Sequence, residues 1–355
     1  MCVIGYTINL LFLTFMCNRL HMNGVGNGLT TIKDVAKHAG VSVATVSRYL
    51  NSKGYISEGA RKRIEEAVKE LNYRPNQIAR SLSTKRMQTI GLIVPDITNP
   101  FFPEIARAIE DTALKEGYTV ILCNSDEQAH KERQYLEMLA QKYIAGFIIA
   151  TNQLERDYYT GLNIPLVLLD RIADGTLPSV TSRNKEGAFM GTEHLLACGV
   201  REVACISGPG HVVPAQERIQ GFLKAVEGRN VKTHVVESPF QFKEAEKIAY
   251  DLLAASPGID GVFAGNDVIA IGVQRAAHRL GLSVPEDVQI VGYDGILLGD
   301  MVTPGLTTVA QNIYQLGETA VDMLLKIING ETLDNEHVAI TPRLIVRDST
   351  KETTT

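Results

Sequence analysis

Apolar residues between positions 31 and 73 recur at helical spacing in three short stretches. Residues 31–40 (TIKDVAKHAG) predict a helix that ends at Gly40. Residues 41–51 (VSVATVSRYLN) predict a second helix with Ser42 as N-cap, and residues 57–73 (SEGARKRIEEAVKELNY) a third with Ser57 as N-cap. The expected core positions are Ile32, Val35, Ala36, Ala39, Ala60, Ile64, Ala67, Val68 and Leu71. Two helices joined by a short glycine-containing turn predict an all-α helix-turn-helix headpiece.

From Thr89 onward, apolar runs of strand length alternate with amphipathic helices. The runs are 89–97, 118–125, 145–151, 165–170, 202–209, 233–238, 261–267 and 288–294, and helical stretches include 102–117, 131–142 and 267–281. Continuous apolar strands separated by helices are typical of parallel sheets buried on both faces. Two such sets, divided near residues 182–186, predict an α/β core of two doubly wound parallel-sheet lobes with a cleft between them.

The segment between headpiece and core, residues 74–86 (RPNQIARSLSTKR), holds a short candidate helix flanked by cations. Pro75 suits a first helical turn, and Ile78, Ala79 and Leu82 share one side. Isolated helices shorter than about 12–15 residues are marginal in water. This segment therefore needs a partner in order to fold.

The first 29 residues include the apolar stretch VIGYTINLLFLTFMC, which is shorter than the roughly 20 residues that span a bilayer. No Lys or Arg precedes it, so it lacks the basic start of a signal peptide. We expect residues 1–29 to be an extension from a mis-assigned start, with Met22 or Leu29 as the true first residue. A genuine membrane anchor is the alternative.

Charge separates the small headpiece from the large core. Residues 30–88 carry 12 Lys and Arg against 5 Asp and Glu, a net charge of +7, whereas the whole chain has −5, which leaves −12 for the rest. A basic module on an acidic body suggests a polyanion partner for the module alone; one solvated helix face is the alternative.

The five cysteines form no C-x-x-C pair and no metal-ligand spacing, so neither a disulfide framework nor a metal site is expected, and a reducing cytoplasm fits. Cys123, Cys198 and Cys205 are expected in the core.

Polar residues follow four of the apolar runs, and a further apolar run at 306–310 (LTTVA), at the end where ligands bind in open α/β sheets. They are Asn99, Asp170, Asn266, Asp294 and Gln311, and the aromatic pair Phe101 and Phe102 lies near the first of them. Taken singly, each could be a solvent-edge residue; together they favour a lining for a sugar, whose hydroxyls pair with carboxylates and amides and whose C–H faces pack on rings. No catalytic constellation is present in the sequence: there is no G-x-S-x-G and no Walker lysine, and the GPG at 208–210 is a weak phosphate cradle.

Five ordered motifs together resemble the lac and galactose repressor family over nearly the whole chain after residue 30. They are TIKDVAKHAGVSVATVSRYLN, LNYRPNQIARSL, GLIVPDITNPFF, AGNDVIAIG and VGYD. Within that family the chain is most similar to the ribose-responsive repressors of Gram-positive bacteria. The resemblance implies a headpiece at 30–75, a hinge helix at 76–88 and a periplasmic-binding-protein-like core at 89–355. Its N-lobe would take residues 89–183 and 312–341, and its C-lobe 184–311 and 342–350.

The resemblance also implies which residues contact DNA. The second headpiece helix would lie in the major groove with Val43, Ala44 and Arg48 at the bases. Arg48 can donate two hydrogen bonds to guanine, and Val43 and Ala44 can meet thymine methyls; simple helix packing is the alternative for the last two. Leu82 would wedge into a minor-groove base step, and the small Ala79 would let paired hinge helices approach. The full implied set is Thr31, Val43, Ala44, Thr45, Ser47, Arg48, Asn51, Ala79 and Leu82.

For the effector, the resemblance points to a pocket like that of ribose-binding proteins. The implied lining is Asn99, Phe101, Phe102, Asp170, Arg171, Arg218, Phe240, Asn266, Asp294 and Gln311. Purine-binding members need an arginine and a threonine where this chain has Val212 and Pro214, which argues against a nucleobase. Catabolite regulators carry arginines for a phosphocarrier protein where this chain has Leu297 and Thr303, so that partner is not expected.

The expected protein is a cytoplasmic, homodimeric, non-enzymatic repressor that binds double-stranded operator DNA and is released by a small sugar, D-ribose first. It needs no cofactor, metal or membrane. The polar C-terminal sequence carries no leucine heptads, so a tetramer is not expected. Another sugar or a sugar phosphate as effector stays open. From other classes, a transport receptor or a sugar-acting enzyme is the alternative, although a receptor has no use for a basic headpiece.

Overall fold

The computed structural model describes residues 30–353 except 51–53, 74–86, 152 and 171–176. Its contacts divide the chain into two units, Met1–Ser83 and Thr84–Thr355, and each is described by itself. The predicted extension at 1–29 and all of the predicted hinge helix except Met87 and Gln88 lie outside the described residues. In the part that is described, no helix has the length and apolarity needed to cross a bilayer.

The first unit holds three helices, α2 (Ile32–Ala39), α3 (Val43–Leu50) and α4 (Glu58–Glu70). A capping box between Thr31 and Asp34 begins α2, and Gly40, at φ 63°, ends it as the sequence predicts. The Ser42 hydroxyl accepts from the Thr45 N–H at 3.1 Å, which confirms the expected cap of α3. Ser57 takes the N-cap position of α4, as the sequence predicts, but its side chain makes no cap hydrogen bond.

The headpiece core is small; the predicted faces of α2 and α4 form most of it, together with Val46 of α3, which was not predicted. Val35, Val46, Ile64 and Ala67 are fully buried, and Val68 and Leu71 pack at its edge, half-buried. Apolar residues from all three helices meet there, and a ~45-residue unit has little more apolar surface to bury. The turn between α2 and α3 is therefore held between packed helices, as a helix-turn-helix requires.

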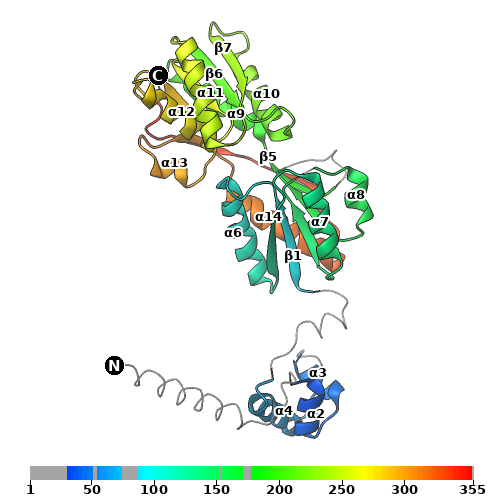
Figure 1. The fold of residues 1–355 in the computed structure, drawn as a ribbon. Coiled ribbons are helices and arrows are strands. Elements are labelled where there is room, and N and C mark those ends of the chain that lie inside the picture. The colour runs from blue at the N-terminus through cyan, green and yellow to red at the C-terminus, as the bar shows by residue number, and fades with distance from the viewer. Residues whose placement is uncertain (1–29, 51–53, 74–86, 152, 171–176, 354–355) are drawn as a thin grey trace, which may run out of the picture. The chain divides into compact units, whose positions relative to one another are not determined.

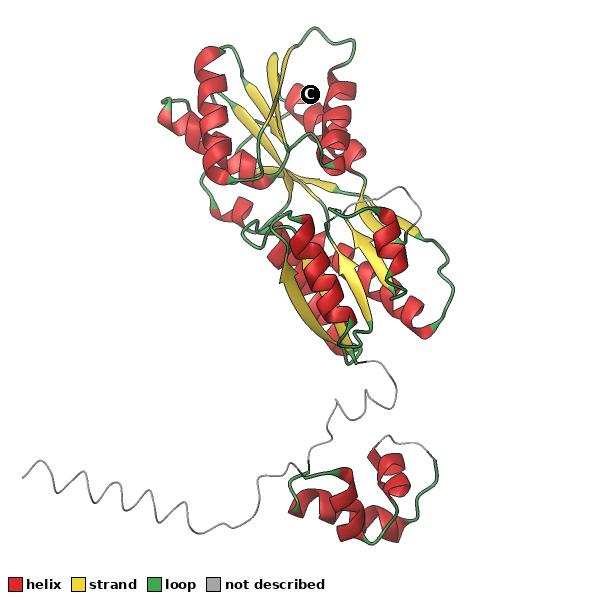
Figure 2. Ribbon diagram, turned by 45° about the vertical axis from the view of Figure 1, so that its right-hand side comes forward, coloured by secondary structure: helices red, strands yellow, loops and turns green. Residues whose placement is uncertain are grey.

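The second unit contains two six-stranded sheets with helices on both faces of each (Figures 1 and 2). The sheet of the N-lobe has the order β11-β5-β4-β3-β1-β2 and is parallel throughout. Its strands are β1 (Thr89–Val94), β2 (Thr119–Asn124), β3 (Gly146–Ile149), β4 (Leu166–Leu169), β5 (Ser179–Ser182) and β11 (His337–Ile340). Its helices are α6 (Phe101–Lys115), α7 (Ala129–Ala140), α8 (Arg156–Gly161) and α14 (Ile313–Asn329).

The sheet of the C-lobe has the order β12-β10-β9-β8-β6-β7. Its strands are β6 (Glu202–Ser207), β7 (Lys232–Glu237), β8 (Gly261–Ala264), β9 (Gln289–Asp294), β10 (Thr307–Ala310) and β12 (Arg343–Ile345). Its helices are α9 (Asn184–Ala197), α10 (Val213–Val226), α11 (Phe242–Ala255), α12 (Asp267–Arg279) and α13 (Leu298–Met301). One edge strand, β12, runs antiparallel to β10, which the expectation of purely parallel sheets did not include. A short antiparallel edge on a parallel sheet is common.

Alternate residues of the central strands serve opposite faces of each sheet. In β1, Ile90, Leu92 and Val94 pack under α6 and α14, whereas Ile93 packs under α7 and α8. The same division in the C-lobe places α11 and α12 on one face and α9 and α10 on the other. Burial on both faces explains the continuous apolar runs in the sequence and confirms the predicted fold class. Cys123, Cys198 and Cys205 are buried and free, as expected, and burial raises the pKa of Cys205 to about 12.

The chain passes between the two lobes three times. It leaves the N-lobe sheet after β5 and enters α9, returns from β10 to α14, and leaves again from β11 to β12. All three crossings involve strands at one edge of each sheet, namely β5 and β11 in the N-lobe and β10 and β12 in the C-lobe. Such a set of connecting segments between two domains is the arrangement of a hinge. The carboxyl ends of the central strands in the two lobes face one another across the cleft beside these connections.

Candidate functional site

One face of helix α3 is exposed to solvent and carries both apolar and charged side chains. Val43 is 41% exposed, and Ala44 and Arg48 are also exposed, whereas Val46 is fully buried and turns to the core. These exposures oppose the alternative that Val43 and Ala44 serve packing alone. The predicted base-contacting side chains therefore lie together on the free side of the second helix of the turn.

Of the other predicted DNA contacts, two lie at helix N-termini, one is half-buried on α3, and three lie outside the described residues. Thr31 is the N-cap of α2, and Thr45 hydrogen bonds with Ser42 at the start of α3, so both lie at helix N-termini, where backbone N–H groups favour phosphate. Ser47 is half-buried. Asn51, Ala79 and Leu82 lie outside the described residues.

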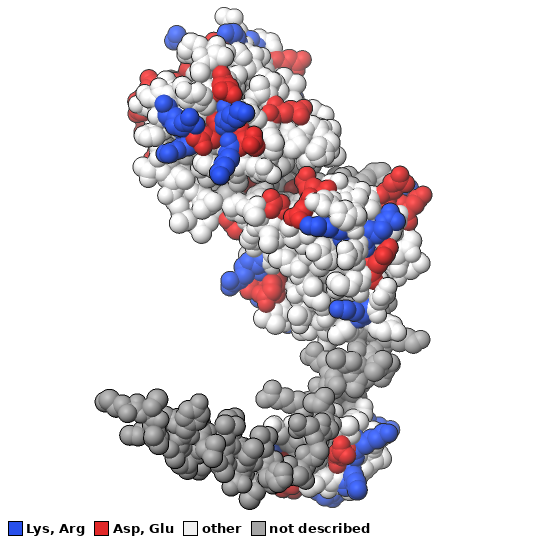
Figure 3. All heavy atoms as spheres, viewed as in Figure 1, with Lys and Arg blue, Asp and Glu red and all other residues white. Residues whose placement is uncertain are grey.

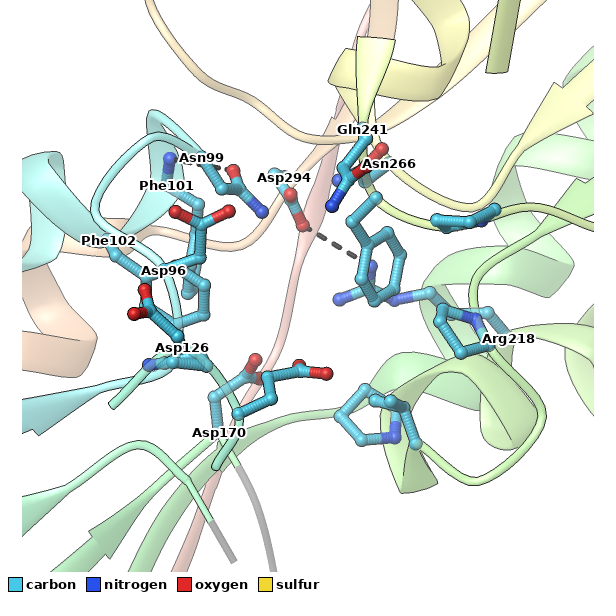
Figure 4. A pocket seen from close by; sticks show the side chains of 17 residues that line it. Asp96, Asn99, Phe101, Phe102, Asp126, Asp170, Arg218, Gln241, Asn266 and Asp294 are labelled. Carbon is cyan, nitrogen blue, oxygen red and sulfur yellow. Dashed lines mark hydrogen bonds and ion pairs between the residues drawn. The ribbon is translucent and has the colours of Figure 1, made fainter. Parts of the chain in front are cut away.

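A cavity of about 270 Å³ opens between the two lobes at the carboxyl ends of their strands (Figure 4). The N-lobe lines it from the loops after β1, β2 and β4, and the C-lobe from those after β6, β7, β8 and β9. Eight of the ten predicted ligand residues line it: Asn99, Phe101, Phe102, Asp170, Arg218, Phe240, Asn266 and Asp294. Strand-end residues far apart in the sequence thus converge on one space, as the topology requires.

Arg218 is the buried cation of this cavity, with 3% of its surface exposed. Its Nε donates to Asn184 Oδ1 at 2.9 Å and its Nη1 to the Gly265 carbonyl at 2.6 Å. The same Nη1 lies 3.3 Å from Asp294 Oδ1, and the guanidinium carbon lies 3.8 Å from the centre of the Tyr293 ring. A buried guanidinium is tolerated only when paired and hydrogen-bonded, so this network sets the orientation of Arg218 in advance.

Asp294 ends β9 with an unusual backbone, at φ 108°, and is 5% exposed. A non-glycine residue at such a φ is strained, and strain of this kind concentrates at functional sites. Gln311 Nε2 donates to Asp294 Oδ1 at 2.6 Å. Burial raises the pKa of Asp294 to about 7, opposed by Arg218 and Gln311 and reinforced by the charges of Asp170 and Glu104. Asp294 is therefore a carboxylate whose ionised form gains from any further donor placed in the cavity.

Aromatic rings cover the cavity from both lobes. Phe101 and Phe102 are almost fully buried and meet edge to face, with ring centres 5.2 Å apart and an interplanar angle of 84°. The ring of Phe240 lies against the backbone of Gly208, where an added Cβ would approach Phe240 Cζ to 2.1 Å. The GPG turn thus has a steric reason: Gly208 makes room for Phe240.

Of the other two predicted ligand residues, one lies behind the cavity lining and one is not described. Gln311 is fully buried behind Asp294, and its side-chain amide orients the Asp294 carboxylate. Arg171 lies outside the described residues. The roles of all ten residues toward a sugar remain predictions.

Sequence reasoning missed several residues that line the cavity. They are Pro95, Asp96, Asp126, Glu127, Pro209, Pro239 and Gln241; Val212 and Pro214, named against a nucleobase, line it too. Asp96 follows β1 and Asp126 and Glu127 follow β2, so the strand-end rule could have found all three. Asn184, which orients Arg218, follows β5, but the sequence of that strand, SVTS, is not an apolar run and so gave no such signal.

The described lining is strongly acidic. Asp96, Asp126, Glu127, Asp170 and Asp294 are carboxylates, whereas Arg218 is the one cation among the described lining residues. Asp126 is itself paired with Lys131, which lies outside the lining. Carboxylate and amide acceptors suit the hydroxyls of a neutral polyol and repel an anion. Among the described residues no cluster of His, Cys, Asp and Glu could hold a metal ion.

Two known families match this chain. Residues 31–76 match "Bacterial regulatory proteins, lacI family", and residues 192–350 match "Periplasmic binding protein-like domain". The chain is 51% identical over 323 residues to a ribose operon repressor of Halalkalibacterium halodurans, an alignment that covers 91% of this chain and 98% of that relative.

Solved structures give the same picture. A regulator from Alkaliphilus metalliredigens complexed with D-xylulofuranose is 36% identical (TM-score 0.70; 75% of this chain, 100% of that one). A regulator from Enterococcus faecium with bound ribose is 32% identical (TM-score 0.68; 74% and 98%). The lac repressor dimer bound to operator and an anti-inducer is 27% identical (TM-score 0.83; 91% and 99%). The headpiece, the two-lobed core and these relatives together establish that the chain belongs to the lacI family of bacterial regulatory proteins.

Proposed function

We propose that this protein is a transcriptional repressor that binds operator DNA through its headpiece and releases it when D-ribose occupies the cavity between the lobes. The observation that carries this proposal is the cavity, because its size, its acidic lining and its opposed rings fit one neutral sugar. The similarity to a ribose operon repressor and to a regulator with bound ribose supports the same effector.

The cavity favours a monosaccharide over a larger ligand. At about 270 Å³ it is slightly smaller than the usual range of ligand pockets, roughly 300–1,000 Å³. Arg218, Asn266 and Asp294 offer donors and acceptors from the C-lobe, and Asn99 and Asp170 from the N-lobe. Phe101, Phe102 and Phe240 would pack on the C–H faces of the ring. A pentose can satisfy both lobes at once.

Charge favours the free sugar over its phosphate. A phosphate dianion would enter a space lined by the carboxylates of Asp96, Glu127, Asp170 and Asp294, while the charge of Arg218 is already paired. Burying such an anion without a compensating cation is costly. We therefore expect ribose 5-phosphate to bind far more weakly than ribose.

On the DNA side, α3 would enter the major groove with Arg48, Val43 and Ala44 at base edges. The exposed cations Lys33, Lys37, Arg61, Lys62 and Arg63 would neutralise phosphates near it. In Figure 3 the visible face of the core carries Lys and Arg interspersed with Asp and Glu, whereas the sequence gives residues 30–88 a net charge of +7 and the rest of the chain −12. The headpiece is therefore the part of the chain suited to DNA.

A homodimer would present two headpieces to the two halves of an operator. The core has exposed apolar side chains suited to a second copy: Leu298 and Met301 of α13 are 40% and 69% exposed, and Leu122 on the edge strand β2 is 46% exposed. We therefore propose a homodimer in the cytoplasm whose two headpieces bind one operator. The lac repressor dimer on its operator supports it by similarity.

Release requires that ribose bind the two lobe arrangements unequally. A sugar held from both sides favours the closed arrangement, and closure would move the N-lobes that connect to the headpieces. A tenfold loss of operator affinity needs only about 1.4 kcal/mol of this preference. Another pentose is the second candidate effector, because one similar regulator was solved with D-xylulofuranose.

Calorimetric titration with D-ribose, ribose 5-phosphate, D-xylulose, adenine and fructose tests the effector directly. Binding of a DNA duplex, selected by the protein from a random-sequence pool, is then followed by fluorescence anisotropy with and without the tightest sugar. We expect ribose to bind most tightly and to weaken the complex at least tenfold. Failure of every sugar to change DNA binding would refute the proposal, and chemical conversion of ribose would favour an enzyme instead.

A further inference from the structure

The three residues after Asp294 each direct a backbone N–H at a carboxylate. Gly295 and Ile296 donate to Asp267 Oδ2 at 2.8 and 2.9 Å. Leu297 donates to Glu104 Oε1 at 2.9 Å. Segment 295–297, here called the bridging loop, is therefore held by one carboxylate from each lobe, because Asp267 begins α12 of the C-lobe and Glu104 lies in α6 of the N-lobe.

Asp267 anchors the loop firmly to its own lobe. It is fully buried, and its second oxygen, Oδ1, accepts from the Thr308 hydroxyl of β10 at 2.6 Å. Burial and the Asp294 charge raise the pKa of Asp267 to about 8, and the three donors oppose that rise. The loop thus moves with the C-lobe, and with it Asp294 at its start.

The contact with Glu104 is different, since it joins the lobes. Glu104 lies in the first turn of α6, directly after the ring pair Phe101 and Phe102. The Leu297 side chain is 64% exposed, so its backbone N–H, rather than apolar packing, makes the link. Because its two partners belong to different lobes, this hydrogen bond beside the cavity depends on how the lobes are placed relative to one another.

We propose that Glu104 is a positioning residue that favours lobe closure on the sugar by accepting the Leu297 N–H across the cleft. It acts through the bridging loop, which holds Asp294 at the cavity, and not by touching the sugar. This inference rests on the proposed function. It assigns sugar affinity in part to a residue outside the cavity lining.

If Glu104 only stabilised its own helix, its replacement would lower the stability of the protein without acting through the contact with Leu297. An acidic side chain in the first turn stabilises its own helix through the helix dipole, whatever the state of the lobes. Its charge also raises the pKa of Asp294, so loss of that charge alone would ease ionisation of Asp294. Glu104→Gln removes the charge but keeps an acceptor oxygen for Leu297, whereas Glu104→Ala removes both.

The test is calorimetric titration of the full chain with D-ribose for wild type, Glu104→Ala, Glu104→Gln and the control Glu116→Ala, an exposed carboxylate near the other end of α6. We expect Glu104→Ala to raise the ribose Kd about tenfold, as for loss of one hydrogen bond to a charged group. Glu104→Gln should stay within about threefold of wild type and Glu116→Ala should match it. Affinity for DNA without ribose should not fall in any of the variants, because loss of a closing contact does not disfavour the open, DNA-binding arrangement.

Equal ribose Kd values for Glu104→Ala and wild type would overturn the inference. So would equal weakening by the alanine and glutamine variants together with equally lowered melting temperatures, which would indicate the helix-dipole role. Wild-type protein that binds no ribose would overturn the proposed effector and this inference with it, so the wild-type titration tells the two failures apart.

Discussion

Replacing Asp294 by Asn changes one atom in the middle of the cavity and removes its buried negative charge. The isosteric amide keeps an oxygen that can accept from Gln311 Nε2, so the shape of the site is preserved. A sugar hydroxyl that donates to Asp294 loses a hydrogen bond to a charged acceptor, which contributes about 1.5–3 kcal/mol. The ribose Kd should therefore rise about 10- to 150-fold.

The same change leaves the Arg218 guanidinium without its carboxylate. Removing one partner of a buried ion pair costs about 3–5 kcal/mol when the remaining charge is unsatisfied. Arg218 keeps the Gly265 carbonyl, Asn184 Oδ1 and the Tyr293 ring, so we expect a cost in unfolding free energy below that range. The variant should fold, with a lowered melting temperature.

Calorimetry for ribose and anisotropy on the selected duplex separate the two effects. DNA affinity without sugar should be unchanged, and the ribose concentration needed for release should rise in proportion to the Kd. Asp251→Asn, a matched change at an exposed position of the C-lobe, should leave all three quantities at wild-type values. An Asp294→Asn protein that is released at the wild-type ribose concentration would show that Asp294 is not part of the effector site.

Three further outcomes follow from the structure. Arg48→Ala should weaken binding to the selected duplex by about 1–3 kcal/mol and relax base preference at one position, measured by anisotropy on single-base variants of the duplex; a uniform loss across all variants would indicate a phosphate contact. Wild-type ribose affinity should rise between pH 6 and 8 as Asp294, with its pKa near 7, becomes ionised, and a flat calorimetric profile would contradict this. Gly208→Ala should raise the ribose Kd about tenfold, because its Cβ would displace Phe240; Gly161→Ala, where a Cβ meets nothing within 4 Å, should not.

The strand-end rule was the strongest guide from sequence to site. Parallel strands bring their carboxyl ends to one edge, so Asn99, Asp170, Asn266 and Asp294 could be expected together without any knowledge of the packing. Each of them lines the cavity. The rule was applied too narrowly, since Asp96 and Asp126 satisfy it as well.

Residues placed by helix packing could not be found in this way. Arg218 lies on α10 and reaches the cavity because α10 packs on α9, where Asn184 orients it from 34 positions away. Its own surroundings in the sequence, ERIQG, resemble any exposed helix turn, and only the family resemblance singled it out. The antiparallel β12 was missed for a related reason, because its pairing with β10 is a contact between distant parts of the chain.

The division of the lining between two lobes decides which ligands can act as effectors. A ligand shifts an equilibrium only by its unequal affinity for the two states. Under the proposed function, contacts with Arg218, Asn266 and Asp294 alone would be available to an open C-lobe, so they would contribute affinity without any preference for closure. Preference for closure would come from groups that also reach Asn99 or Asp170 in the N-lobe. A deoxy sugar that keeps the first set of contacts and loses the second should therefore occupy the cavity, compete with ribose, and leave the repressor on its DNA.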